Sequence, residues 1–277
     1  MNKSLKQRIS ALVAAIFLSV IFLCSCSSDD GSSDKNILPE LIIGSDYYHP
    51  FIYRADNGDF AGIDVELATE ICRHIGYKPK FVQIEWSDKK AYLARGEVDC
   101  LWGSFTLTGR ENDYAWTLPY MNSRQVVAVQ ENSGIEKISD LENKRVAVQS
   151  TTKPDEIFSG VSGMQNLQIP KLKELNCFPN MTYTFAAINN GYVDAIAGHE
   201  VALKEYMKTS FVKLRILDES LLDVQIGVAF LKNTHSDLIE KINNTFLLLK
   251  NNGYLASLVL SYGLNPDVYV IDYKFLR

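Results

Sequence analysis

Two short stretches of the sequence carry residues that could do chemistry. Thr151 and Thr152 are followed by Lys-Pro-Asp-Glu at 153–156, and a proline in the first turn after a threonine is typical of a helix start. The free backbone N–H groups of such a start can bind an anion. The second stretch is His199-Glu200, the one pair of side chains that we consider for general acid catalysis. The sequence therefore offers one candidate anion site and one candidate acid.

Patterns typical of other active sites and of metal sites are missing from the sequence. There is no Ser-His-Asp order and no phosphate-binding glycine loop. The histidines are scattered, and no Cys/His spacing suits zinc. Cys72 lies on an apolar helical stripe and Cys100 in an apolar strand, so we expect both to be buried thiols. We expect neither a metal nor a cofactor.

Length and composition indicate two domains and exclude several classes of protein. The chain has 277 residues, and single cores usually split beyond roughly 250–300 residues. The net charge is −5 and no long basic run is present, which argues against a nucleic-acid partner. The most apolar stretch, residues 9–23, is shorter than the roughly 20 residues that a spanning helix needs. A polytopic membrane protein is therefore excluded.

The N-terminus has the architecture of a secretory signal. Basic residues within the first eight positions precede the apolar run, and small residues follow it. Leu-Cys-Ser-Cys at 23–26 resembles the bacterial lipobox, in which Cys26 would be the lipidated residue. We therefore predict a lipoprotein signal peptide over residues 1–25. An uncleaved N-terminal anchor and a plainly secreted form are the alternatives.

Residues 26–37 predict how the mature protein is held. They form a mostly polar string with little to bury, which is typical of a flexible tether. We expect the mature chain to be extracytoplasmic and attached to the bacterial cell membrane by the lipid on Cys26.

An internal repeat organises the rest of the chain. The pattern G-x-V-D-x-[Leu/Ile]-x-G occurs at 96–103 and again at 191–198. Each copy follows a predicted helix that ends at the glycine. An apolar strand lies further upstream of each copy, at 41–44 and at 146–149. The repeat therefore predicts two α/β lobes, each a small sheet with helices on both faces.

The connections between the halves predict how the lobes are linked. A strand at 126–129 leads from the first half to the second, and an apolar run at 224–230 leads back. The last helix, near 236–250, then rejoins the first lobe. The predicted boundaries are 38–122 with 226–277 for lobe 1 and 123–225 for lobe 2. Two facing lobes place the carboxyl ends of their strands, where ligands bind in open α/β sheets, at one cleft.

Several motifs together resemble one protein family. Gly-Ser-Asp-Tyr-Tyr-His-Pro-Phe at 44–51 and Gly-Ile-Asp-Val-Glu-Leu-Ala at 62–68 are similar to the opening of family 3 extracellular solute-binding proteins. Gln-Ser-Thr-Thr at 149–152 is a further match, and the likeness runs from about 41 to 264. These proteins are the amino-acid receptors of ABC importers. The resemblance implies a type II periplasmic-binding-protein-like fold: two α/β lobes, lobe 1 discontinuous, joined by a two-strand hinge that closes on the ligand.

The resemblance assigns one set of residues to a ligand carboxylate. Arg110 matches the arginine that holds the α-carboxylate, and a guanidinium can pair a carboxylate through two N–H groups. Thr106, with Ser104 two residues before it, matches a hydroxyl position that contacts the ligand. Thr151 and Thr152 match the helix start that grips the carboxylate from the second lobe.

A second set would surround the rest of the ligand. Tyr48 and Trp86 match two aromatic positions that wall its side chain, although Trp86 could instead belong to the core. Asp46 points to the cleft in the family and could meet a cationic group or cap its turn. Trp102 could add a third aromatic face or pack in the core.

The main departure from the family is His199. The family commonly has an aspartate there to pair the ligand's α-ammonium, and a neutral imidazole brings no negative charge. A modified amino acid, a peptide fragment or another small carboxylate therefore competes with a standard amino acid as the expected ligand.

These observations predict the substrate-binding lipoprotein of an ABC importer, which captures an amino acid or related carboxylate by hinge closure. The expected partners are the ligand, the permease subunits and the membrane, and the protein is expected to be a monomer and not an enzyme. Two alternatives stay open. The same fold occurs in cyclohexadienyl dehydratases, and a stand-alone binding protein could dock on a separate sensory receptor.

Overall fold

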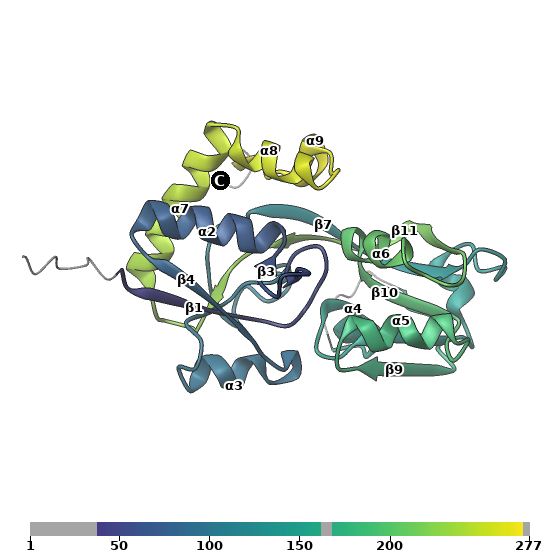
Figure 1. Cartoon of the computed structure of the whole chain (residues 1–277). Coiled ribbons are helices and arrows are strands. Elements are labelled where there is room, and N and C mark those ends of the chain that lie inside the picture. Colours follow the sequence, from purple (N-terminus) through teal and green to yellow (C-terminus); the bar gives the residue numbers. More distant parts are fainter. Residues whose placement is uncertain (1–37, 162–167, 274–277) are drawn as a thin grey trace, which may run out of the picture. The chain divides into compact units, whose positions relative to one another are not determined.

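Two five-stranded sheets organise the part of the chain that the structure, a computed structural model, describes: residues 38–161 and 168–273 (Figure 1). The first sheet has the strand order β4-β1-β5-β12-β6, and the second has the order β11-β7-β10-β8-β9. The predicted signal peptide, Cys26 and the tether lie outside the described residues.

Parallel pairs form one side of each sheet. In the first sheet β1 pairs with β4 and β5 in parallel, and in the second β8 pairs with β9 and β10 in parallel. The first sheet contains β1 (Glu40–Ser45), β4 (Lys78–Gln83), β5 (Cys100–Leu101), β6 (Ala115–Trp116) and β12 (Ala229–Phe230). The second contains β7 (Met121–Gln130), β8 (Arg145–Gln149), β9 (Glu174–Phe178), β10 (Ala195–His199) and β11 (Leu214–Ile226). A separate hairpin joins β2 (Tyr53–Arg54) and β3 (Phe60–Ala61).

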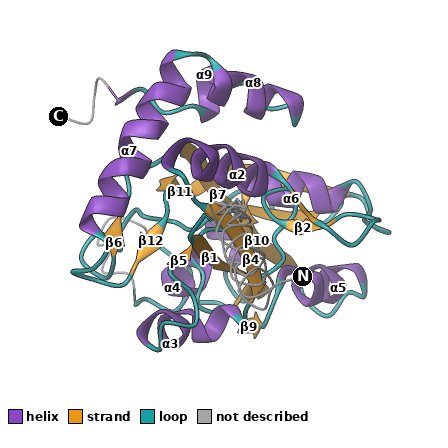
Figure 2. Ribbon diagram, turned by 60° about the vertical axis from the view of Figure 1, so that its left-hand side comes forward, coloured by secondary structure: helices purple, strands orange, loops and turns teal. Residues whose placement is uncertain are grey.

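Helices flank these strands (Figure 2). Figure 1 shows α2 and α3 on opposite sides of the first sheet. The helices that precede β7 or follow β11 in the chain are α2 (Ile63–Ile75), α3 (Lys89–Ala94), α7 (Ser236–Asn251), α8 (Tyr254–Ser261) and α9 (Pro266–Tyr269). Those within the second half are α4 (Lys153–Phe158), α5 (Met181–Asn189) and α6 (Glu200–Met207). Two 3-10 turns, η1 (Trp86–Asp88) and η2 (Ile138–Leu141), complete the described elements.

The sequence repeat has the same structural role in both sheets. The Asp99 carboxylate accepts the Ile42 backbone N–H at 2.7 Å, and the Asp194 carboxylate accepts the Arg145 N–H at 2.8 Å. Each aspartate also donates its own N–H to the carbonyl of the same partner. The two aspartates therefore fix the register of β5 on β1 and of β10 on β8.

The chain crosses between the sheets twice. It passes from β6 in the first sheet to β7 in the second, and returns from β11 to β12. The apolar run expected at 224–230 is therefore not one strand, because β11 ends at Ile226 and Gly227 donates its N–H to the Phe105 carbonyl instead. Over Met121–Gln125 the strands β7 and β11 pair antiparallel. The exact lobe boundaries at 122/123 and 225/226 stay a prediction.

The core settles one question that the sequence left open. Trp102 is fully buried and packs against Tyr120 and Phe246, with ring centroids 6.1 and 6.2 Å away. It therefore belongs to the core and adds no aromatic face to the site described below. Cys72 and Cys100 are buried free thiols, as predicted, and burial raises the pKa of Cys72 to about 12.

Candidate functional site

A small cavity lies where the carboxyl ends of β1 and β8 meet β5, β7 and β10. Its volume is about 30 Å³, room for a water molecule or two, because side chains from both sheets fill the space. Eight of the nine ligand-binding residues predicted from the sequence line it: Asp46, Tyr48, Trp86, Ser104, Thr106, Arg110, Thr152 and His199. The other lining residues are Gly103, Phe105, Gln125, Gln149, Lys153 and Pro154.

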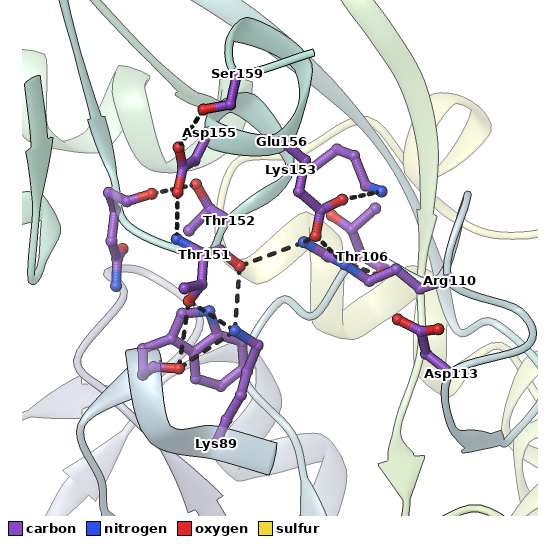
Figure 3. A network of polar contacts seen from close by, with 12 residues as sticks. Lys89, Thr106, Arg110, Asp113, Thr151, Thr152, Lys153, Asp155, Glu156 and Ser159 are labelled. Atoms are coloured by element: carbon purple, nitrogen blue, oxygen red, sulfur yellow. Dashed lines mark hydrogen bonds and ion pairs between the residues drawn. The ribbon is translucent and has the colours of Figure 1, made fainter. Parts of the chain in front are cut away.

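Arg110 is buried and its guanidinium is engaged by the protein (Figure 3). Its Nε and Nη2 both donate to Glu156 Oε1, at 2.9 and 2.6 Å. Nη1 donates to the Thr106 carbonyl at 3.1 Å, and Nη2 also reaches the Thr151 carbonyl at 3.4 Å. The arginine therefore already pairs with one carboxylate, and that carboxylate comes from the other half of the chain.

Glu156 stands between two cations. Its second oxygen, Oε2, accepts from Lys153 Nζ at 2.6 Å, and the Lys153 side chain has no exposed surface. Burial and the nearby Arg110 charge lower the pKa of Lys153. Sequence reasoning did not assign a role to Lys153 or Glu156, although both lie in the helix start that it singled out.

The two threonines before α4 are also bonded within the protein. The Thr151 N–H donates to Asp155 Oδ2 at 2.7 Å, and the Thr152 N–H donates to the Gln149 carbonyl. Thr151 has a positive φ of 58°, a conformation that few residues other than glycine adopt. Thr151 does not line the cavity, and its carbonyl faces Arg110 and Lys89. A grip on a ligand carboxylate by these threonines stays a prediction.

Lys89 is a buried cation that the sequence analysis missed. Its Nζ donates to Thr151 Oγ1 at 2.7 Å, to the Thr151 carbonyl at 3.1 Å and to the Trp86 carbonyl at 3.3 Å (Figure 3). Burial, assisted by the positive charge of Arg110, lowers its pKa to about 7. Lys89 therefore ties α3 to the segment before α4.

Asp46 and Gln149 meet across the cavity. Gln149 Nε2 donates to Asp46 Oδ2 at 2.5 Å, and both residues are almost fully buried. Burial raises the pKa of Asp46 to about 7, although the Gln149 bond and the Lys89 charge act in the opposite direction. This acid is thus a buried carboxyl group at the end of β1, facing the end of β8.

His199 is a neutral and fully engaged imidazole. Gln125 Nε2 lies 3.0 Å from its Nε2 and can only donate, so we assign the ring proton to Nδ1, which donates to Ser123 Oγ at 2.8 Å. Thr106 Oγ1 also lies 3.2 Å from Nε2. Burial, with the Arg110 charge as a second cause, lowers the pKa of His199 to about 3.

The pair considered for acid catalysis is not brought together. The Glu200 carboxylate is 2.8 Å from Lys204 Nζ and 3.7 Å from Arg124 Nη1, while His199 bonds to Ser123, Thr106 and Gln125. Glu200 does not line the cavity, because successive residues at the end of β10 point in different directions. The structure therefore gives no support to a shared His199–Glu200 acid.

Aromatic side chains form part of the cavity wall. Tyr48 is buried, its hydroxyl accepts the His199 backbone N–H at 3.2 Å, and its ring meets the imidazole edge-on. Trp86 packs edge-to-face on Phe105, with centroids 5.0 Å apart, and also belongs to a core cluster. Trp86 therefore belongs to the core and also lines the cavity, while its contact with a ligand stays a prediction. Phe105 is a third aromatic residue of the wall, which the sequence analysis missed.

Three buried polar atoms of the cavity residues have no hydrogen-bond partner among the described residues. They are Ser104 Oγ, Gln125 Oε1 and Gln149 Oε1. Native proteins seldom leave such atoms unpaired. Two of the three can only accept a hydrogen bond. The cavity is therefore suited to a ligand that brings N–H or O–H donors.

Asp64 holds the loop that carries Ser104. Its carboxylate accepts the Ser104 N–H at 2.7 Å and the Tyr120 hydroxyl at 2.8 Å, and only 1% of the residue is exposed. Ser104 itself has a positive φ of 51°, so its loop needs such support.

Replacing Asp64 by alanine should lower the free energy of unfolding by about 2 kcal/mol or more, because two buried donors lose their acceptor. Urea unfolding measures the loss. Asp64→Asn keeps one acceptor oxygen and should cost less, and Asp56→Ala, at an exposed position, should change little. A loss below about 0.5 kcal/mol for Asp64→Ala would contradict the supporting role.

The sequence profile described as bacterial extracellular solute-binding proteins, family 3, matches residues 41–265. This chain belongs to that family. Among its relatives, the probable amino-acid-binding protein YxeM of Bacillus subtilis (strain 168) is 25% identical over 264 residues, which cover 94% of this chain and 96% of YxeM. The histidine-binding periplasmic protein of Salmonella typhimurium is 29% identical over 246 residues, covering 84% and 90% of the two chains.

Solved structures of the family share the fold, which confirms the predicted type II periplasmic-binding-protein architecture. The substrate-binding protein of an ABC uptake transporter from Streptococcus pneumoniae, with bound histidine, superposes with a TM-score of 0.73 at 23% identity, covering 80% of this chain and 92% of that one. An ancestral amino-acid-binding protein described as a precursor of cyclohexadienyl dehydratase gives 0.71 at 24% identity, covering 80% and 95%. Among the described residues, no helix is both long and apolar enough to cross a membrane.

Proposed function

We propose that this family 3 protein is the substrate-binding lipoprotein of an ABC importer and that it captures an amino acid or a related small carboxylate in the cavity. The observation that carries the proposal is the convergence of Arg110 with three unpartnered polar atoms, from Ser104, Gln125 and Gln149, in one buried space between the sheets. A ligand with one anionic end and several donors would satisfy all of them. Family membership supports the class of ligand.

The ligand's carboxylate is assigned to Arg110. Thr106 and Ser104 lie on the same strip of the cavity wall and offer hydroxyl groups to it. Thr151 and Thr152, from the second half, would complete the contact once the side chains between the sheets rearrange.

The ligand's ammonium is assigned to the opposite set of groups. His199 has no charge to offer, because its imidazole stays neutral and both ring nitrogens are bonded. Asp46 can supply the missing negative charge, and the free Oε1 atoms of Gln125 and Gln149 can accept hydrogen bonds. Tyr48 and Trp86 would flank the ligand's side chain.

Binding requires the cavity to open. Its volume of about 30 Å³ is too small for an amino acid, and direct bonds such as Asp46–Gln149 cross it. We propose that the two halves move apart and close again by bending within β7 and β11, near 121–123 and 224–226, where the chain crosses between the sheets.

A thermal-shift panel tests the binding function. The full chain in mild detergent is heated with each of the twenty amino acids and with small carboxylates such as acetate and succinate. A true ligand at one hundred times its Kd stabilises the folded state by about 2.7 kcal/mol, which corresponds to a rise in Tm of about 5–10 °C. A panel in which no compound raises Tm would refute the proposed class of ligand.

The proposed anchor predicts where a variant of Cys26 is found. In cells, Cys26→Ser should move the protein from the membrane fraction to the soluble fraction, because stable attachment needs the acylated cysteine. Cys24→Ser, two residues away, is the matched control and should leave the protein at the membrane. Fractionation with labelling by a palmitate analogue measures both. Membrane retention of Cys26→Ser would instead indicate an uncleaved N-terminal anchor.

The importer role further predicts a permease partner and an extracytoplasmic location. Cell-surface accessibility of the anchored protein and loss of uptake on its deletion would support them. The protein is proposed to act as a monomer and to catalyse no reaction.

A further inference from the structure

Glu156 is bonded to the Arg110 guanidinium, the group that is proposed to hold the ligand's carboxylate. A guanidinium has five N–H groups. In Arg110 two of them go to Glu156, one to the Thr106 carbonyl and one to the Thr151 carbonyl (Figure 3). The side chain of Arg110 is 4% exposed, so solvent cannot replace these bonds. A ligand carboxylate therefore finds Arg110 almost saturated.

The charges around Glu156 resemble those of a carboxylate-binding site that is already filled. Arg110 contacts one of its oxygens and Lys153 the other, and both cations are buried. Lys89, also buried, donates to the Thr151 carbonyl that Arg110 Nη2 also reaches, and its pKa of about 7 leaves it only partly protonated near neutral pH. Buried cations are stabilised by a partner of opposite charge. A ligand carboxylate can therefore pair with Arg110 through Nε and Nη2 only when Glu156 gives up these bonds.

The position of Glu156 allows it to leave. It sits on the first turns of α4, three residues after Lys153, and its side chain is 26% exposed, far more than those of its two partners. It can therefore turn toward solvent and away from Arg110. Arg110, which is fixed by Thr106 and by the aromatic face of Phe105 at 5.1 Å, has no such freedom.

From these contacts we infer that Glu156 is an internal competitor, which the carboxylate of the ligand must displace from Arg110. Glu156 thereby sets the affinity of the site and its selectivity for carboxylates. This inference rests on the proposed function. A ligand without a carboxylate does not compete with Glu156 and gains nothing from its removal.

The test compares acids with their neutral amides. The full chain and its Glu156→Gln variant are titrated by calorimetry with L-histidine, L-arginine and L-glutamine and with the carboxamide of each. Removing the competing charge should tighten binding of at least one acid by about tenfold or more, because the charge-assisted bonds of Arg110 become free. The affinity for the matching amide should change less than about twofold.

Two further variants separate displacement from other effects. Glu111→Gln removes one exposed negative charge next to Arg110 without touching the guanidinium, since within residues 38–161 and 168–273 Glu111 accepts only the Gly109 N–H, and it should leave acid affinity nearly unchanged. Glu156→Asp keeps the charge on a shorter side chain and should give an intermediate gain. Glu156→Gln leaves Lys153 unpaired. If that variant folds poorly for this reason, Glu156→Asp still allows the comparison of acids with amides.

The outcomes distinguish this inference from the proposed function. Equal or weaker acid binding by both Glu156 variants overturns the competitor role, and equal tightening for acids and amides does so too. The proposed function survives either result if an amino acid raises Tm in the panel. If neither the wild type nor a variant binds any acid and the panel is also negative, the proposed function fails and the inference fails with it.

Discussion

Replacement of Arg110 by alanine should weaken the binding of an amino acid by roughly thirtyfold or more. Truncating one partner of a desolvated charge pair typically costs about 2–5 kcal/mol, and each 1.4 kcal/mol is a factor of ten. Arg110 is the buried cation whose bonds reach Thr106 on one side of the cavity and Glu156 on the other. Without it, the carboxylate of a bound ligand has no bidentate partner.

Calorimetry on the full chain in mild detergent measures this loss. Arg95→Ala is the matched control, because Arg95 is 54% exposed and contacts Glu97 and the Tyr92 ring, neither of which lines the cavity, so its removal should leave affinity unchanged. An affinity of Arg110→Ala within about threefold of the wild type would place the ligand's carboxylate elsewhere.

Replacement of Asp46 by asparagine should weaken the binding of ammonium-bearing ligands by about tenfold or more, because a charge-assisted hydrogen bond is worth about 1.5–3 kcal/mol. The variant should also lose a pH dependence of ligand affinity that we expect in the wild type. The pKa of Asp46 is about 7, so below pH 7 the carboxyl is largely protonated and must release its proton to pair with an ammonium. In the wild type, affinity should therefore fall as the pH drops below 7, by up to about tenfold per pH unit.

The effect of Asp46 on the pH dependence of binding must be distinguished from the effects of other charged groups near it. Lys89 and Glu85 face it, Gln149 bonds to it, and Lys89 itself has a pKa of about 7. Titrations at pH 6, 7 and 8 on wild type and Asp46→Asn isolate the carboxyl, because Lys89 is present in both. A pH profile that is identical in the two proteins would contradict the assignment of the ammonium to Asp46.

Much of the fold could be predicted because its determinants are local in sequence. Each copy of the repeat places a helix-ending glycine, an aspartate and a strand within eight residues, and Asp99 and Asp194 then bond to the strand that each sheet is built on. The spacing alone thus indicated two equivalent sheets. The resemblance to family 3 located Asp46, Arg110 and six of the twelve other residues that line the cavity.

The missed residues act through contacts that no local pattern records. Glu156 reaches Arg110 across 46 positions in the chain, and Lys89 reaches Thr151 across 62. A lysine or glutamate in a short amphipathic stretch is usually solvated. These charges are buried and paired only because the two sheets pack together, which is a tertiary contact that the local sequence does not show. The division of 224–230 into two strands also depends on tertiary contacts, namely the bond from Gly227 to Phe105.

A crystal structure of the full chain with the amino acid that raises Tm most would test the binding site most directly. We expect the ligand between the two sheets, with its carboxylate oxygens about 2.7–2.9 Å from the Arg110 guanidinium and its ammonium facing Asp46. Glu156 should have left Arg110. A ligand bound outside this cavity, or one bound within it while Arg110 still pairs with Glu156 and contacts no ligand carboxylate, would contradict the proposed site.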